Sequence, residues 1–188
     1  TDNTAKILKG YGKTIRTITL EENSGKGAAL KRGILAANHE LILFIDADGS
    51  IDVEFLPALV EALNKTPFAS GPRETRASNT GTGLPIPRQL AAIGFNLIVN
   101  SLFPLRNFDT LCGLKGMRAK EGKEIVTEMR STGWIFDVEL LEIARRKGYK
   151  VTKIPIRWKH IQESKMRFGH TTIKILLQLL RLKIRLMR

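Results

Sequence analysis

Residues 41–50 read LILFIDADGS, and this stretch decides the fold. Its five leading residues are all apolar and two are β-branched, which is typical of a buried strand in a parallel sheet. That strand runs directly into two aspartates, Asp46 and Asp48, followed by a glycine. In open α/β sheets, ligands bind at the carboxyl ends of the strands. Both carboxylates are therefore predicted to lie at a ligand-binding edge.

Two carboxylates this close repel each other unless a cation lies near them. A hard divalent ion, Mg²⁺ or Mn²⁺, held by Asp46 and Asp48 together with substrate phosphates, suits this pattern. A plain strand-ending turn is the competing interpretation, because aspartate and glycine are both turn formers. An EF-hand is excluded, since Gly49 comes too early in the loop and Pro57 stands where a glutamate is needed.

The chain has 188 residues, enough for one domain with a single hydrophobic core. Its one cysteine, Cys112, excludes an internal disulfide, and together with three scattered histidines it makes no zinc pattern. The 31 lysines and arginines against 18 acidic residues give a net charge of +13. Such a charge attracts polyanions, so nucleic acid, anionic lipid and phosphorylated substrates are all candidate partners.

Helical and strand patterns alternate along the chain, which predicts an α/β fold with a mostly parallel sheet flanked by helices. Helices are predicted over 5–10, up to 37 from the loop at 21–27, over 53–64, 88–103 and within 133–147. Strands are predicted over 14–20, 41–45, 68–71, 151–158 and directly after 109–113.

Three further segments carry candidate function. The glycine-rich loop 21–27 precedes a helix, whose first N–H groups can hold an anion, although a flexible turn is the alternative. The polar loop 74–87, bordered by arginines, is either a lid that binds phosphate or a plain surface loop. The tail 171–188 mixes leucines with basic residues and has no acid. It predicts a helix at a membrane interface, with packing on the domain as the alternative.

Six of these short motifs, taken together and in order, resemble the GT-A family 2 glycosyltransferases. They are NSGKG at 23–27, DADG at 46–49, GPR at 71–73, DTLCGLK at 109–115, WIFDVEL at 134–140 and SK at 164–165. More narrowly, they are similar to the polyprenyl-phosphate branch, the dolichyl-phosphate glucose and mannose synthases, with the glucosyl enzymes the nearer match. Members of that family begin with a strand that leads into the motif Asp-Asp-Gly-Ser-x-Asp-x-Thr. TDNT at 1–4 resembles the end of this motif, so the acidic pair at its beginning has no counterpart in this sequence. The resemblance thus implies that this strand is missing here.

The resemblance implies a GT-A domain over 1–168, incomplete at its N-terminus, and a membrane-interfacial helix over 169–188. It implies an inverting, metal-dependent transfer of a hexose from a nucleotide sugar to polyprenyl or dolichyl phosphate, peripherally at the cytoplasmic face of a membrane. Glucose from UDP-glucose is favoured over mannose from GDP-mannose, and Mg²⁺ or Mn²⁺ is the expected cofactor. Nucleic acid is not an expected partner.

The matching positions carry the family's roles. The expected catalytic residues are Asp48, Asp109 and Asp137, although helix capping or loop support would also explain the last two. The donor sugar nucleotide would be bound by Asp2, Asn23, Lys26 and Asp46. The acceptor phosphate would be bound by Arg73, Arg88 and Lys165, and the metal by Asp46 and Asp48.

Two other functions stay open at this point. The charge could mark a nucleic-acid-binding module, but the chain has only two Trp and two Tyr and no nucleic-acid motif. Its strongest basic block also interleaves with leucines instead of stacking aromatics. The other reading is a non-catalytic fragment that keeps the fold and has lost the donor site.

Overall fold

A computed structural model describes residues 3–71, 86–105, 108–110, 112–156 and 170–187. Its longer helices are α1 (Thr4–Gly10), α2 (Lys26–Ala36), α3 (Leu56–Lys65), α4 (Ile86–Leu102), α5 (Ala119–Glu128), α6 (Phe136–Arg146) and α7 (His170–Leu186). Two 3₁₀ turns are η1 (Gly12–Thr14) and η2 (Val53–Phe55), and the strands are β1 (Leu41–Phe44), β2 (Phe68–Ser70), β3 (Lys115–Arg118) and β4 (Val151–Lys153).

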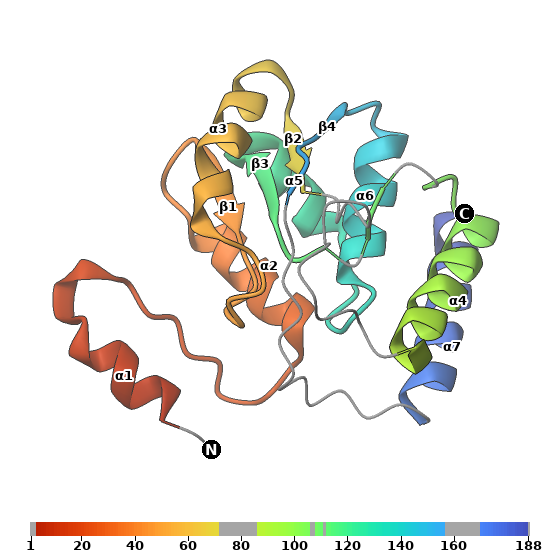
Figure 1. The fold of residues 1–188 in the computed structure, drawn as a ribbon, viewed down its shortest axis with the longest axis horizontal. Coiled ribbons are helices and arrows are strands. Elements are labelled where there is room, and N and C mark those ends of the chain that lie inside the picture. Colours follow the sequence, from red (N-terminus) through yellow and green to blue (C-terminus); the bar gives the residue numbers. More distant parts are fainter. Residues whose placement is uncertain (1–2, 72–85, 106–107, 111, 157–169, 188) are drawn as a thin grey trace.

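The four strands form one mixed sheet in the order β1-β3-β2-β4 (Figure 1). β3 pairs antiparallel with both of its neighbours, while β2 and β4 pair in parallel. Three strands therefore run in one direction and only β3 opposes them, so the predicted α/β class is confirmed but the sheet is mixed rather than mostly parallel. Because β3 lies between β1 and β2, it brings the segment before Lys115 to the same sheet edge at which β1 ends.

Helices cover both faces of the sheet, because side chains along each strand alternate between two hydrophobic clusters. Ile42, Phe68 and Met117 pack on one face against α2, α5 and α6. On the other face, the cluster that includes Ala69 and Leu114 is covered by α3. A third cluster joins α4, α6 and α7, so the C-terminal helix is packed on the domain along one side.

Most predicted elements are found, but one predicted strand is absent from the described residues and one helix was not predicted. The strand predicted over 14–20 is wrong: no described strand pairs with this segment, and Ile15 and Ile18 stay 39% and 40% exposed. Without a neighbouring strand, an alternating pattern has no ladder to join. The helix α5 was not predicted, because its sequence AKEGKEIVTE is mostly polar.

Candidate active site

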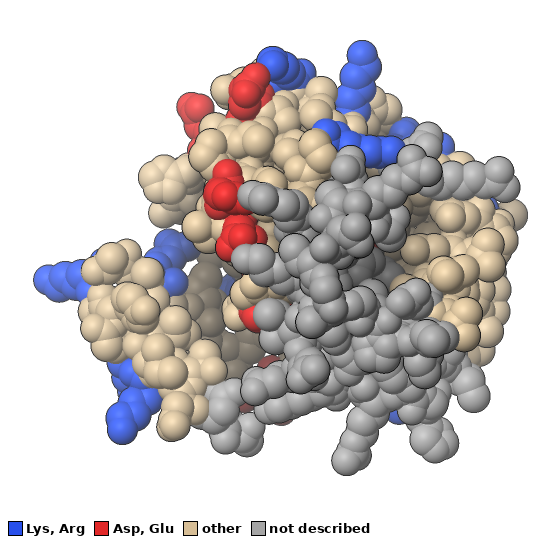
Figure 2. Space-filling model, in the orientation of Figure 1, with Lys and Arg blue, Asp and Glu red and all other residues tan. Residues whose placement is uncertain are grey.

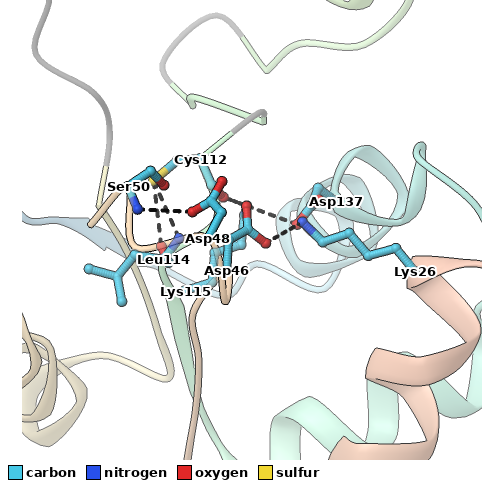
Figure 3. Close-up of polar contacts among 8 residues, drawn as sticks. All are labelled: Lys26, Asp46, Asp48, Ser50, Cys112, Leu114, Lys115 and Asp137. Atoms are coloured by element: carbon cyan, nitrogen blue, oxygen red, sulfur yellow. Dashed lines mark hydrogen bonds and ion pairs between the residues drawn. The ribbon is translucent and has the colours of Figure 1, made fainter. Parts of the chain in front are cut away.

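The site is built first from the turn that follows β1. Gly49 has a φ of +73°, in the left-handed region that glycine adopts readily. The turn lets the backbone N–H of Ser50 donate to Asp48 Oδ1 at 2.9 Å (Figure 3). Burial raises the pKa of Asp48, but hydrogen bonds from Ser50 and the charge of Lys26 outweigh it, so the pKa falls below its usual value of 3.8. Asp48 is thus a carboxylate at neutral pH.

The first residue of α2 completes this edge. Lys26 Nζ lies 2.7 Å from Asp46 Oδ1, and the two side chains keep 30% and 34% of their surface exposed. The sequence separates them by 20 positions, so the glycine-rich loop and the end of β1 meet at this ion pair. A partly exposed pair such as this can exchange partners with an incoming phosphate or cation.

The backbone of Gly113 lies close against the Asp46 side chain. A Cβ at this position would overlap a carboxylate oxygen of Asp46, so only glycine leaves that side chain its place. Gly113 belongs to the turn before β3, in which the backbone N–H of Cys112 donates to the carbonyl of Asp109 at 3.4 Å. The 109–113 motif therefore contributes a close backbone approach to the first carboxylate of the pair.

A second lysine–aspartate pair lies beneath the turn. Lys115 Nζ, 2.8 Å from Asp137 Oδ1, is almost fully buried, at 2% against 10% for its partner (Figure 3). The same ammonium donates to the carbonyl of Cys112 and lies 5.9 Å from the centre of the Phe44 ring. It thus ties the start of α6 to the end of β1 and to the turn before β3.

The loop that joins α5 to α6 holds the glycine-rich loop in place. The backbone N–H of Ala28 donates to the Thr132 carbonyl at 3.1 Å. Gly25 has a φ of +92°, and a Cβ there would come within 2.6 Å of that same carbonyl oxygen. Both glycines of the GKG sequence are needed here, since a Cβ on Gly27 would also collide with this loop and with Phe136.

Glu139 holds the loop between α5 and α6 in place through hydrogen bonds. This carboxylate is fully buried and accepts the backbone N–H groups of Arg130 at 3.0 Å and Ser131 at 2.7 Å. It also forms an ion pair with Arg185 of α7. A buried carboxylate with several charge-assisted partners fixes its neighbours strongly. The C-terminal helix is thereby connected, through one side chain, to the loop that supports Lys26.

The predicted site residues are only partly brought together. Asp46, Asp48 and Lys26 form one group at the edge of the sheet, and Asp137 lies behind them in its ion pair. Asn23 is exposed, and its side chain accepts the backbone N–H of Gly25 at 3.1 Å, which shapes the loop. Asp109 is half-buried in the turn before β3. Asp2, Arg73 and Lys165 lie outside the described residues, as does the side chain of Arg88 in α4.

The sequence did not reveal the parts that Lys115 and Gly113 play. Both lie inside a quoted motif, but only the fold shows that one is buried against Asp137 and the other against Asp46. The one feature of the sequence that could have pointed to Lys115 is the position of this lysine at the start of a short buried strand. Such a charge requires a partner, and Asp137 is that partner.

The residues present suit a divalent cation. Within the described ranges, no group of three or more His, Cys, Asp or Glu side chains could hold a metal. Asp46 and Asp48 supply two carboxylates, the number that Mg²⁺ commonly takes from a protein when waters and substrate phosphates complete its shell. Lys26 is the charge that currently neutralises Asp46.

Comparison with known proteins decides the family. The model for glycosyl transferase family 2 matches residues 1–120 of the chain. The chain belongs to this family. This match confirms the resemblance inferred from the motifs.

Several curated relatives are dolichyl-phosphate beta-glucosyltransferases. The protein from Trichomonas vaginalis is 30% identical over 193 residues, covering 97% of this chain and 57% of the relative. The Saccharomyces cerevisiae protein is 32% identical over 197 residues, covering 93% and 59%. The human protein is 32% identical over 177 residues, covering 88% and 55%. The chain thus spans little more than half the length of the relatives it matches.

Solved structures confirm the GT-A fold. Glucosyl-3-phosphoglycerate synthase from Mycobacterium tuberculosis, in complex with Mg²⁺ and UDP, superposes with a TM-score of 0.64 at 17% identity. The match covers 97% of this chain and 64% of that one. The same enzyme in complex with Mn²⁺ and UDP-glucose gives 0.60 at 19% identity, covering 97% and 64%. At these identities the likeness establishes the fold alone.

Proposed function

We propose that this glycosyl transferase moves glucose from a nucleotide sugar, UDP-glucose in the first place, to the phosphate of a polyprenyl or dolichyl lipid. The observation that carries the proposal is the group formed by Asp46, Asp48 and Lys26 at the end of β1. This group can hold a diphosphate and its counter-ion, and the relatives named dolichyl-phosphate beta-glucosyltransferases supply the class of donor sugar and acceptor.

The chemistry needs positioning more than a strong base. The second pKa of a phosphate monoester is about 6, so the acceptor is largely ionised at neutral pH. One of its oxygens attacks the anomeric carbon of the sugar, and the bond from that carbon to the nucleoside diphosphate breaks. The configuration at the anomeric carbon is inverted. The leaving group carries away the electron pair, and no proton has to be removed from the nucleophile.

The residues of the chain then have distinct tasks. Lys26 would turn from Asp46 toward the diphosphate, where a cation stabilises the charge that develops on the leaving group. When bound to Asp46 and Asp48, a divalent ion would neutralise the same charge as a Lewis acid. Asp137 would act through Lys115 by holding α6 and the turns in position. We propose that Arg73, Arg88 and Lys165 receive the acceptor phosphate, because arginines bind phosphate in a bidentate manner.

The exposed faces of α4 and α7 support a membrane location. On α4, three apolar side chains one turn apart are more than half exposed: Leu90, Ile93 and Leu97. On α7, Leu179 and Leu182 are buried, whereas Leu177, Leu180 and Ile184 are 48%, 40% and 57% exposed. Each helix thus presents one apolar face to the domain and another outward, and the two helices lie side by side (Figure 1).

Exposed leucines interleaved with basic residues suit the interface of a bilayer, which is where a lipid acceptor lies. No helix in the described part of the chain is long and apolar enough to cross a membrane. We therefore propose that the domain lies on the cytoplasmic face of a membrane through α4 and α7, and that residues 169–188 act as the interfacial helix.

Transfer of radiolabelled sugar into the organic phase tests the proposal. The assay offers UDP-glucose or GDP-mannose with polyprenyl phosphate and Mg²⁺ or Mn²⁺, to this chain and to one extended upstream. We expect label from UDP-glucose, and its loss in Asp48→Asn but not in the matched exposed variant Asp52→Asn. Label from GDP-mannose alone would reassign the donor. Absence of label from both donors with both chains would overturn the proposal.

A further inference from the structure

A cavity of about 220 Å³ lies between α7 and the loop that joins α5 to α6. Three arginines line it, Arg130 from the loop and Arg181 and Arg185 from the helix, together with Gln178 and Thr132. At about 30 Å³ for each water molecule, the cavity has room for roughly seven waters. A phosphate-sized anion with part of its hydration shell therefore fits. None of Lys26, Asp46 or Asp48 lines this cavity.

The charges around the cavity do not balance. Arg185 is paired with the buried Glu139, which also holds two backbone N–H groups. Arg130 and Arg181 are exposed, and within the described ranges neither has an acidic side chain at ion-pair distance. Two arginines from different elements thus line one cavity, and neither has a described counter-charge. Guanidinium groups bind phosphate through paired, charge-assisted hydrogen bonds.

We propose that this cavity is a binding site for a phosphate group, carried either by an anionic lipid headgroup or by a soluble phosphate. The proposal is independent of the proposed sugar transfer, because it concerns different residues and is measured by binding alone. Gln178 and Thr132 also line the cavity, and a side-chain amide or hydroxyl of this kind can donate a hydrogen bond to a phosphate.

The surroundings favour the lipid as the source. Gln178 and Arg181 belong to the same helix as the exposed Leu177 and Leu180. If those leucines enter the interface, the arginines of the next turn lie at the level of the headgroups. Trp134, next to the lining residue Gly133, is 52% exposed, and tryptophan is enriched at that level. Basic side chains near an anionic leaflet contribute attraction that falls off with salt.

The cavity also borders the loop that supports the donor site. Thr132 is a lining residue, and its carbonyl accepts the backbone N–H of Ala28 in α2. An occupant would therefore contact the segment that holds the first turn of α2 in place.

The test compares the full chain with Arg130→Gln/Arg181→Gln and with the control Lys9→Gln/Lys13→Gln. The control removes the same charge from exposed residues in and just after α1, a region with basic side chains on its surface (Figure 2), far from α7 (Figure 1). Flotation measures binding to vesicles of neutral phosphocholine lipid, with and without an anionic phosphoserine lipid. In parallel, the unfolding midpoint is measured in inorganic phosphate and in chloride of equal ionic strength. No nucleotide sugar or acceptor is present in either arm.

For a lipid headgroup, the arginine pair should lose roughly 30-fold in affinity for anionic vesicles, while neutral vesicles bind it as before and the control changes much less. For a soluble phosphate, inorganic phosphate should raise the unfolding midpoint of the chain and of the control but not of the arginine pair. The proposal is overturned if the arginine pair and the control behave alike in both arms.

Discussion

Two lysine–aspartate pairs of nearly equal length lie close together in this molecule, and they differ in burial. Lys26 and Asp46 are 2.7 Å apart and about one-third exposed. Lys115 and Asp137 are 2.8 Å apart, but they keep only 2% and 10% of their surface exposed. In the first pair, water or a ligand can replace either partner. In the second, the cost of exposing or unpairing a buried charge keeps the partners together.

The difference in burial suits the two pairs to different roles, ligand binding for the exposed pair and structural support for the buried one. In the proposed function, Asp46 and Lys26 would exchange each other for a cation and a diphosphate, whereas Lys115 and Asp137 hold the start of β3 and the start of α6 together. Ion-pair distance alone does not distinguish the two roles. The surrounding packing does, because Lys115 lies among buried residues and also donates to the carbonyl of Cys112.

The largest expected effect comes from breaking the buried pair. Lys115→Met leaves Asp137 as an unpaired, buried carboxylate, which should lower the free energy of unfolding by about 3–5 kcal/mol. Urea denaturation followed by circular dichroism measures the loss. The matched control is Lys65→Met, which removes an exposed lysine from its pair with Glu61 and should hardly shift the midpoint. Equal shifts for both variants would contradict the assignment of Lys115 to support.

A smaller effect is expected at Gly113, which lies against the Asp46 side chain of the exposed pair. Gly113→Ala forces the Asp46 side chain aside and overpacks the turn, at a cost of about 1–3 kcal/mol in stability. The displaced carboxylate should also bind Mn²⁺ more weakly, which isothermal titration calorimetry measures. Gly133→Ala, where a Cβ meets open space, serves as the control. Unchanged Mn²⁺ affinity in Gly113→Ala would show that the close approach has no role in the site.

The exposed pair should show the opposite behaviour to the buried one. Lys26→Gln should change the free energy of unfolding by no more than about 1 kcal/mol, because exposed ion pairs contribute little. Its effect should appear in binding of the donor, which is expected to weaken roughly tenfold through loss of a charge-assisted hydrogen bond. Equilibrium binding of labelled UDP-glucose gives the value. A stability loss as large as that of Lys115→Met would make the two pairs equivalent.

The smallest expected effect is on how the stability of the protein changes at acid pH. The folded pKa of Asp48 lies below 3.8, so its contribution to stability is complete above that value and is lost as the pH falls through the folded pKa. Asp48→Asn lacks this group and should therefore lose slightly less stability than the wild type on acidification. Unfolding midpoints at neutral pH and below pH 3.8 provide the comparison. Identical acid dependence would place the pKa of Asp48 elsewhere.

Much of the fold was predictable from local patterns. The apolar run before Asp46 is a strand, the SGKG loop opens a helix, and the tail is an amphipathic helix, because each pattern is strong over its own length. The segment 14–20 shows the limit: its alternation is as clear, but a strand exists only where another strand pairs with it. The antiparallel direction of β3 could not be predicted either, because the four residues KGMR do not indicate which strands they pair with or in which direction.

The residues of the candidate site also fall into those that the sequence could predict and those that it could not. Asp46, Asp48 and Lys26 were identifiable because carboxylates after a strand and a lysine in a glycine-rich loop carry chemical meaning of their own. The roles of Lys115, Gly113 and Glu139 depend on contacts across 8 to 67 positions of sequence. The burial of a charge and the space beside a glycine are properties of the packed fold, and a linear pattern contains neither.

One measurement tests most directly the claim that the exposed pair, and not the buried one, belongs to the active site. Electron paramagnetic resonance follows the loss of the free Mn²⁺ signal as the chain is added, with and without UDP. The account predicts binding by the wild type that is strengthened by UDP, kept in Asp52→Asn and lost in both Asp46→Asn and Asp48→Asn. Binding that survives in Asp46→Asn and Asp48→Asn would contradict it.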